Sequence, residues 1–172
     1  VTGGTGKDSV NGGNGADSLS GGDGADSISG DNGADSLYGQ NGNALLQGGG
    51  GNDRVLGEGG MDTLWGDTGS DSLTGGGGAD RFAKSGAPGD GADVVMDYDA
   101  AQGDMLWLGQ AGLTAADITI TYATQSGCGD ANIAEAYVTL TATGEVLWIL
   151  ADGAAMNDIW FQSASAAPFL LT

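Results

Sequence analysis

One apolar residue recurs at every ninth position between residues 3 and 83, and most of the residues between are small or polar. The recurring apolar residues are Val10, Leu19, Ile28, Leu37, Leu46, Val55, Leu64, Leu73 and Phe82. In several copies a polar residue stands on each side, as in Ser18-Leu19-Ser20, and this alternation is typical of a short β-strand that buries one face. The pattern therefore predicts nine short strands, each of which contributes one side chain to a core.

The nine-residue interval is the length of a repeat that runs nine times without a break from Gly3 to Ala83. Counted within each repeat, Gly holds positions 1 and 4, an apolar residue holds position 8, and Asp holds position 6 in every copy except one, where Ala44 stands. Because glycine adopts backbone angles closed to other residues, the first six residues are predicted to form a turn and the last three a strand. Two repeats complete one coil of 18 residues, so stacking predicts an all-β fold, a parallel β-roll of two sheets.

Stacking also aligns the Asp residues into two rows, because odd-numbered repeats turn at one edge of the roll and even-numbered repeats at the other. The odd edge holds Asp8, Asp26, Asp62 and Asp80, with a gap at Ala44, and the even edge holds Asp17, Asp35, Asp53 and Asp71. Adjacent strands lie ~4.8 Å apart, so bare carboxylates at this spacing repel one another. A divalent cation between successive turns reverses the sign of that interaction. Calcium is favoured because it takes roughly 6–8 oxygen ligands in flexible geometry, whereas zinc prefers His or Cys, which the repeats lack.

The repeat GGxGxDxUx, in which U is apolar, resembles the nonapeptide of the RTX (repeats-in-toxin) calcium-binding proteins, and the resemblance covers residues 3–83. It implies a parallel β-roll in which each calcium ion lies between two turns of the same edge. It also implies that the position-6 carboxylates bind the ions together with carbonyl oxygens of the turn residues. The residues expected to bind calcium are Asp8, Asp17, Asp26, Asp35, Asp53, Asp62, Asp71 and Asp80, with Asp93 beyond the repeats, and the turn glycines Gly4, Gly6, Gly13, Gly15, Gly22, Gly24, Gly33, Gly51, Gly60, Gly69 and Gly78.

The pairing of turns along each edge sets the expected number of calcium ions. Nine turns give four sites on one edge and three on the other, and Ala44 removes a ligand from the two sites that pair repeat 5 with repeats 3 and 7. We therefore expect about five to seven ions. The formal net charge is −19, of which −9 falls on residues 1–83, so five calcium ions would bring this half to +1. Composition alone would also fit a flexible acidic linker, and we expect this half to be disordered without calcium.

The period stops after Ala83, and residues 84–172 form a second half with a different pattern. Residues 84–92 read as a Gly/Pro loop, and strands are expected over 93–98, 104–108, 118–123, 135–142 and 145–151, with further apolar segments at 159–161 and 169–171. Thr143-Gly144 is a plausible hairpin turn, and Thr114 is a plausible cap of a short helical turn over 113–117. This half should be β-rich, with Trp107, Trp148 and Trp160 in its core.

The start of the second half resembles the segment that follows the repeats in serralysin-type proteases and in the repeat modules of bacterial alginate epimerases. The matching stretches are Gly78-Ala79-Asp80-Arg81-Phe82, Asp93-Val94-Val95-Met96-Asp97-Tyr98 and Gly103-Asp104-Met105-Leu106-Trp107-Leu108, where the family patterns are roughly GADxF, DxIxDF and GDxIDL. Trp107 stands where the family has Asp. We expect residues 1–83 and 84–172 to be a calcium-binding roll and its cap, since the last coil of a repeat array exposes a strand edge. Candidates to finish the last calcium sites, or else solvated loop carboxylates, are Asp90, Asp93, Asp97, Asp99 and Asp104.

The residue inventory separates three classes of function. The chain has no His, so HExxH zinc sites and Ser-His-Asp or Cys-His arrangements are absent, and an enzyme is not expected. A non-catalytic calcium-binding module is favoured, one that folds outside the cell and supports secretion and folding of a larger secreted protein. The alternative is an extracellular binding or adhesion module for a polysaccharide or cell surface, using Tyr38, Trp65, Arg54 and Arg81. The chain has only four basic residues, so no nucleic-acid partner is expected, and no segment is apolar enough for membrane insertion.

The two ends and the single cysteine complete the expectations. Val1 lies almost within the first repeat, so we expect a carboxy-terminal piece of a larger protein with a covalently attached upstream domain. The apolar residues 167–172 are expected to be a signal read by type I export machinery, as the RTX resemblance implies, a final strand of the second half, or both. Cys128 is alone, so it is either an incidental loop thiol or part of an intermolecular disulfide.

Overall fold

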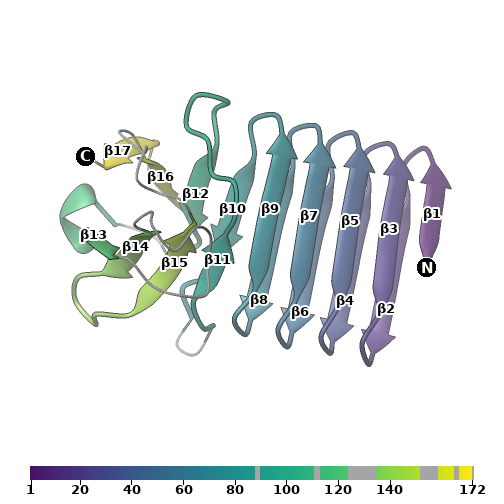
Figure 1. Cartoon of the computed structure of the whole chain (residues 1–172), viewed down its shortest axis with the longest axis horizontal. Coiled ribbons are helices and arrows are strands. Elements are labelled where there is room, and N and C mark those ends of the chain that lie inside the picture. Colours follow the sequence, from purple (N-terminus) through teal and green to yellow (C-terminus); the bar gives the residue numbers. More distant parts are fainter. Residues whose placement is uncertain (88–89, 111–112, 124–134, 152–158, 165–166, 172) are drawn as a thin grey trace.

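The computed structural model describes residues 1–172 except 88–89, 111–112, 124–134, 152–158, 165–166 and 172, and Figure 1 draws it as an elongated roll joined to a wider β-rich end. The strands of the repeats are β1 (Thr2–Thr5), β2 (Ser9–Asn14), β3 (Ser18–Asp23), β4 (Ser27–Asn32), β5 (Ser36–Asn41), β6 (Leu45–Gly50), β7 (Arg54–Gly59), β8 (Thr63–Thr68), β9 (Ser72–Gly77) and β10 (Arg81–Lys84). Those of the second half are β11 (Asp93–Val95), β12 (Met105–Leu108), β13 (Ile118–Ala123), β14 (Glu135–Leu140), β15 (Val146–Leu150), β16 (Ile159–Ser163) and β17 (Phe169–Leu171).

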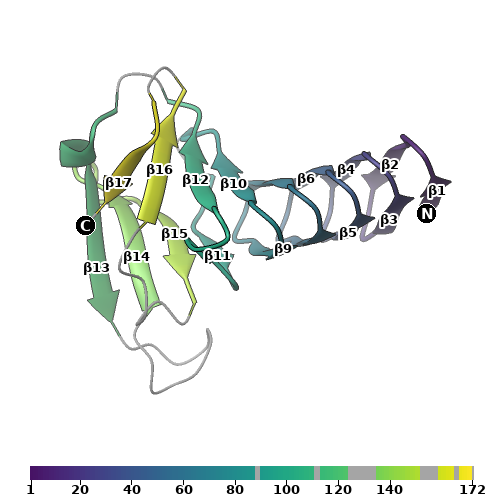
Figure 2. The same ribbon diagram turned by 90° about the horizontal axis from the view of Figure 1, so that it is seen from above.

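The strands alternate between two sheets, as the predicted coil requires. One sheet has the order β1-β3-β5-β7-β9-β11-β15-β14-β13, and the other has the order β17-β16-β12-β10-β8-β6-β4-β2. Within the repeats all neighbours are parallel and partners are 18 residues apart, so Leu19 lies opposite Leu37. Figure 2 looks between the two sheets and shows their strands as facing rows. The parallel β-roll predicted from the repeat is confirmed.

The core is a double row of position-8 side chains between the sheets. Every one of them is buried, and Leu19, Leu37, Leu46, Val55, Leu64, Leu73 and Phe82 have no exposed surface. Each such side chain contributes roughly 1.5–3 kcal/mol through removal of apolar surface from water. Because one coil presents only two of them, the roll depends on contact between neighbouring coils.

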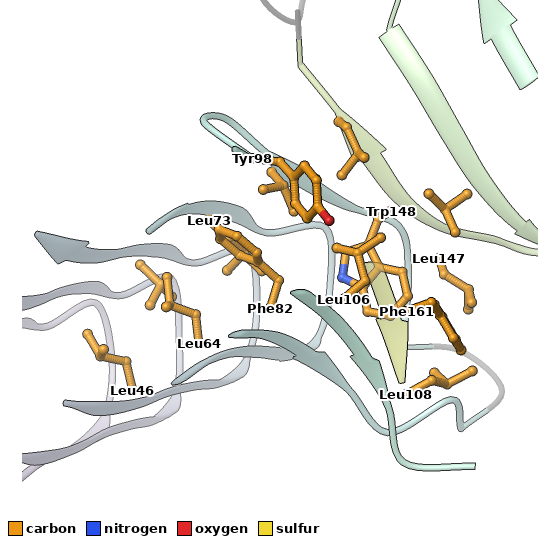
Figure 3. Close-up of a cluster of buried hydrophobic side chains, with 14 of the residues drawn as sticks. Leu46, Leu64, Leu73, Phe82, Tyr98, Leu106, Leu108, Leu147, Trp148 and Phe161 are labelled. Carbon is orange, nitrogen blue, oxygen red and sulfur yellow. The ribbon is translucent and has the colours of Figure 1, made fainter. Parts of the chain in front are cut away.

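The same rows continue into the second half without interruption. In one sheet the register runs from Phe82 to Leu106 and then to Phe161. Figure 3 shows these side chains and Trp148 packed as one cluster at the junction, where the Trp148 and Phe161 rings meet edge to face at 6.3 Å. In the other sheet β11 pairs on one side with β9 and on the other with β15. The second half therefore pairs with both strand edges that the last coil of the repeats would otherwise expose.

The strands are longer and the turns shorter than the sequence indicates. A complete repeat strand has six residues, as in β3 (Ser18–Asp23), which covers positions 7 to 9 of one repeat and 1 to 3 of the next. The turn is reduced to positions 4 to 6. The expected division into six turn and three strand residues is wrong, because the backbone at positions 2 and 3 also pairs with the neighbouring coil, as between Gly22 and Gln40.

The second half is β-rich as predicted, with all the expected strands present and several of them shorter. Thr143-Gly144 lies in the turn that joins the antiparallel strands β14 and β15, and Gly144 has a positive φ of 71°. A 3-10 turn spans Ala115–Asp117 with Thr114 as its N-cap residue, and the Thr114 backbone N–H and hydroxyl both donate to Asp117 Oδ2. Residues 169–171 form β17, which pairs antiparallel with β16, so the prediction of a final strand is confirmed.

Tryptophan placement differs from expectation. Trp148 is fully buried, but Trp160 is 39% exposed, and Trp107 points outward with Trp65 at 5.2 Å between ring centroids. Trp107 follows Leu106 in β12, and adjacent strand residues face opposite sides, so only one of the two can join the core. Cys128 lies outside the described residues. Among the residues that are described, no helix is long and apolar enough to cross a membrane.

Candidate metal centres

The position-6 carboxylates lie inside the ends of the coils. Each stands at the last residue of a turn, two residues before a buried position-8 side chain, and residues two apart along a strand face the same side. The side chains of Asp26, Asp35, Asp53, Asp62, Asp71 and Asp80 are buried, with at most 3% exposed, and Asp8 and Asp17 are half-buried near the open end of the roll. The repeat therefore carries a carboxylate into the interior at every turn.

One oxygen of each carboxylate links successive coils. Oδ1 of Asp26 accepts a hydrogen bond from the backbone N–H of Asp8 at 2.9 Å, and Oδ1 of Asp53 accepts one from Asp35 at 2.8 Å. The same bond recurs along both edges, from Asp17 to Asp35, Ala44 to Asp62, Asp53 to Asp71 and Asp62 to Asp80. Turns 18 residues apart are thus direct neighbours, and the predicted rows of Asp at the two edges are present.

The other carboxylate oxygen has no partner. Oδ2 is buried and accepts no hydrogen bond in any of the eight repeats that carry Asp: Asp8, Asp17, Asp26, Asp35, Asp53, Asp62, Asp71 and Asp80. A buried polar atom without a partner costs roughly 1–3 kcal/mol, and more when it belongs to a charged group. A positive charge beside each of these eight oxygen atoms would therefore stabilise the fold.

A small cradle surrounds each of these oxygens, and the position-1 glycine keeps it open. A Cβ atom added to Gly12 would lie 2.9 Å from Asp17 Oδ2 and 2.9 Å from the carbonyl oxygen of Gly30 in the next coil. A Cβ added to Gly48 would lie 2.5 Å from Asp53 Oδ2 and 2.7 Å from the Gly66 carbonyl oxygen. Any side chain at position 1 would therefore fill the space between a carboxylate and a carbonyl oxygen.

The strand register is interrupted at the same place. Between β2 and β4 it pairs positions 7, 8 and 9, skips Gly12 and Gly30, and resumes at Gly13. The other pairs of six-residue strands also omit position 1. Carboxylate and carbonyl oxygens thus face a gap in the ladder, and this hard-oxygen donor set fits calcium.

The turn carbonyls expected to bind calcium lie along the stack. Carbonyl oxygens at position 4 lie where a side chain at position 4 of the next coil would begin, since a Cβ added to Gly51 would lie 2.0 Å from the Gly33 carbonyl oxygen. Those at position 2 behave in the same way, as between Gly4 and Gly22. Sequence reasoning missed the position-1 carbonyls. Their signal was the presence of Gly at position 1 in all nine repeats, which a turn alone does not require.

Repeat 5 is the exception in structure as well as in sequence. The Ala44 side chain is buried and lies 3.2 Å from the Cβ position of Gly39, where the other repeats hold the Asp side chain. Its N–H still donates to Asp62 Oδ1 at 2.7 Å. The backbone geometry of the turn is therefore preserved, and only the carboxylate is missing.

The five acidic residues suggested for the end of the array all accept hydrogen bonds from the chain itself. Asp93 Oδ1 and Asp104 Oδ1 accept from Asp71 N–H at 3.2 Å and Asp80 N–H at 2.9 Å, as the next Asp does within the repeats. The two oxygens of Asp97 accept from the backbone N–H groups of Gly75 and Gly76. Asp90 accepts from Ser85 and Ala87, and Asp99 accepts from Ala101 and Gln102.

Burial disfavours the ionised form of several of these carboxylates. Desolvation raises the pKa of Asp62 to about 6, although the hydrogen bond from Ala44 N–H opposes the shift and the charge of Asp80 adds to it. Desolvation likewise raises the pKa of Asp104 to about 6 and raises the pKa of Asp53, Asp71 and Asp80. A bound cation would offset this penalty, since an opposite charge favours the carboxylate form.

Other residues singled out in the sequence do not gather into a site. Tyr38 lies on β5 and Trp65 on β8, so they belong to different sheets and cannot form one aromatic platform. Arg54 Nη1 donates to the Tyr38 hydroxyl at 3.4 Å. Within the described residues, no three His, Cys, Asp or Glu side chains form a cluster. One carboxylate oxygen and one backbone carbonyl oxygen converge at the position-1 glycines Gly3, Gly12, Gly30, Gly48 and Gly57.

Fold and sites together define a parallel β-roll with an oxygen-lined cradle at nearly every turn. Residues 2–37, 29–60, 38–71 and 56–83 match the RTX calcium-binding nonapeptide repeat. The repeats of this chain are RTX calcium-binding repeats. The chain is also similar to the solution structure of the AlgE6R3 subunit of the Azotobacter vinelandii mannuronan C5-epimerase, with 25% sequence identity over 88% of this chain and 74% of that one and a TM-score of 0.33. No curated protein matches the chain.

Proposed function

We propose that this chain is a non-catalytic module that folds when it binds about five to seven calcium ions. The observation that carries the proposal is the row of buried Oδ2 atoms without partners, one in each repeat that has Asp. Each would bind an ion together with a position-1 carbonyl of the next coil and with turn carbonyls at positions 2 and 4. Binding free energy would then be folding free energy, since no cradle exists in the unfolded chain.

The second half is proposed to act as a cap for residues 1–83. It pairs both strand edges of the last coil and continues the buried rows, most directly through Leu106 and Val95. An uncapped roll would present open parallel edges, which favour association with other chains. We therefore assign residues 1–83 to the calcium-binding roll and residues 84–172 to its cap.

The biological role proposed for the module is to support secretion and folding of a larger secreted protein. A chain that folds only with calcium stays extended where calcium is scarce and folds where it is abundant, outside the cell. This favours an extracellular location, an attached upstream domain and export through type I machinery. The occurrence of RTX repeats, which are typical of secreted proteins, supports this role.

The test is a calcium titration of the whole chain after removal of metal with a chelator. Far-ultraviolet circular dichroism should show a cooperative gain of β signal with calcium, and calorimetry should give about five to seven ions. Magnesium is the matched control, because it demands octahedral geometry and should need far higher concentration. A full β signal in chelator that calcium leaves unchanged would refute calcium-driven folding.

A further inference from the structure

Lys84 is a buried lysine at the point where the repeats meet the second half. It ends β10 and is 1% exposed, and it is the one basic residue among residues 84–172. Its ammonium lies 2.8 Å from Asp93 Oδ2 and 3.3 Å from the carbonyl oxygen of Asp90. Among the residues that the structure describes, this is the one ion pair between side chains.

Lys84 stands in the register of a position-1 glycine. In the pairing of β10 with β8, Phe82 lies opposite Leu64 and Ala83 opposite Trp65, so Lys84 follows in line with Gly66. A Cβ added to Gly66 would meet the carboxylate of Asp71, the position-6 residue of the same repeat. The Lys84 side chain therefore occupies the space beside the carboxylate that a position-1 glycine leaves empty in the repeats.

Asp93 stands in the register of a position-6 carboxylate. Val95 lies opposite Leu73, so Asp93 precedes its buried partner by two residues just as Asp71 does. Its Oδ1 accepts the hydrogen bond from Asp71 N–H that continues the row along the even edge. Its Oδ2 corresponds to the atom that has no partner in the eight repeats, and here that atom bonds to the Lys84 ammonium.

We propose that Lys84 is a built-in cation that takes the place of a calcium ion in the next cradle of the even edge. This inference rests on the proposed calcium role of the repeats. The ammonium contacts one carboxylate oxygen and one carbonyl oxygen, which are the two donor types found at the other cradles. An ammonium carries three N–H donors, and the two oxygens at 2.8 Å and 3.3 Å occupy most of them.

The other edge ends in a similar way without a metal ion. Asp104 continues the odd row by accepting from Asp80 N–H, and its Oδ2 accepts a hydrogen bond from Asp99 N–H at 2.9 Å. Both carboxylates that close the two rows are thus satisfied by the chain itself. The structural consequence is that the first coil of the second half stays assembled at calcium concentrations too low for the repeats.

The test is Lys84→Gly in the full chain, which restores the glycine of the repeats and vacates the cradle. Calorimetric calcium titration should give one more ion per chain than the parent protein, and Lys84→Gly combined with Asp93→Asn should lose that additional ion. Lys84→Met removes the charge but fills the cradle, so it should bind no additional ion. Lys7→Gly is the charge-matched control at an exposed turn position and should leave the number unchanged.

Hydrogen exchange of the parent chain in chelator provides an independent readout if the variants fold poorly. Amides of β11 and β12 should stay protected while those of β2 to β7 exchange freely. An unchanged ion number in Lys84→Gly, or equal exchange in both regions, would overturn the role of Lys84. Failure of the parent chain to bind calcium would instead refute the proposed function, so the two failures are distinguishable.

Discussion

The substitution Ala44→Asp restores the missing carboxylate. It should destabilise the fold at low calcium concentration and stabilise it at high calcium concentration. The Ala44 Cβ already lies where the other repeats hold the Asp side chain. A carboxylate there could accept from Asp26 N–H, which would complete the odd row, and would direct Oδ2 into the cradle between Gly39 and Gly57. The two sites that pair repeat 5 with repeats 3 and 7 would then gain their ligand.

The magnitude follows from Asp62 on the same edge. Burial raises the pKa of Asp62 from 3.8 to about 6, so an ionised carboxylate in such a place costs about 3 kcal/mol near pH 7 without a cation. Free calcium at about 1,000 times the dissociation constant of the site would contribute about 4.1 kcal/mol. The variant should therefore be about 3 kcal/mol less stable than the parent at low calcium and about 1 kcal/mol more stable at high calcium.

Urea unfolding at a series of free calcium concentrations measures this reversal. The free energy of unfolding, plotted against the logarithm of calcium concentration, has a slope that reports the number of ions bound on folding. This slope should be larger for Ala44→Asp by at least one ion per chain, and the two curves should cross. Ala34→Asp adds the same charge at an exposed turn position and should show no increase in slope. Parallel curves with unchanged ion number would refute the ligand role of position 6 or the pairing of turns along one edge.

Three further changes test other parts of the structure. Gly48→Ala should abolish one ion because the added Cβ would lie 2.5 Å from Asp53 Oδ2, whereas Gly77→Ala, with its nearest atom at 4.0 Å, should bind the full number by calorimetry. In chelator, lowering the pH from about 7 to about 4.5 should increase β signal in circular dichroism. The pKa of Asp62 is raised to about 6, so its ionised carboxylate destabilises the fold above that pH, and protonation removes this cost at lower pH. At saturating calcium, lowering the pH should instead reduce β signal, because protons then displace the bound ions. Residues 1–83 alone should fold only at much higher calcium and should associate, as sedimentation would reveal, since deletion of 84–172 opens both strand edges; a monomeric truncated roll with an unchanged calcium midpoint would contradict the proposed cap.

Most of the roll was predictable because one period carries both its core and its carboxylates. The interval between buried side chains such as Leu19 and Leu37 equals one coil, and this sets the strand partners. An Asp two residues before each buried position must face the interior, so the two rows followed as well. The role of position 1 was harder to predict, because its carbonyl meets the carboxylate only when the next coil is in place, as Gly30 does for Asp17.

The boundary with the second half was less predictable for a geometric reason. Asp93 follows Asp71 by 22 residues rather than 18, so counting along the chain does not bring it into register. Only the pairing of β11 with β9 shows that it continues the even row. The proposed role of Lys84 depends on the same four additional residues between Asp71 and Asp93. They place Asp93 nine residues after Lys84, within reach of its ammonium.

The location of the bound ions tests the proposed calcium sites most directly. Crystals of the whole chain grown with calcium, and examined by anomalous scattering, should place ions beside Oδ2 of the buried repeat carboxylates, each near a position-1 carbonyl of the next coil. No ion should lie beside Asp93, where Lys84 stands. Ions confined to exposed carboxylates such as Asp23 and Asp31, with the buried Oδ2 atoms unbound, would contradict the proposed sites.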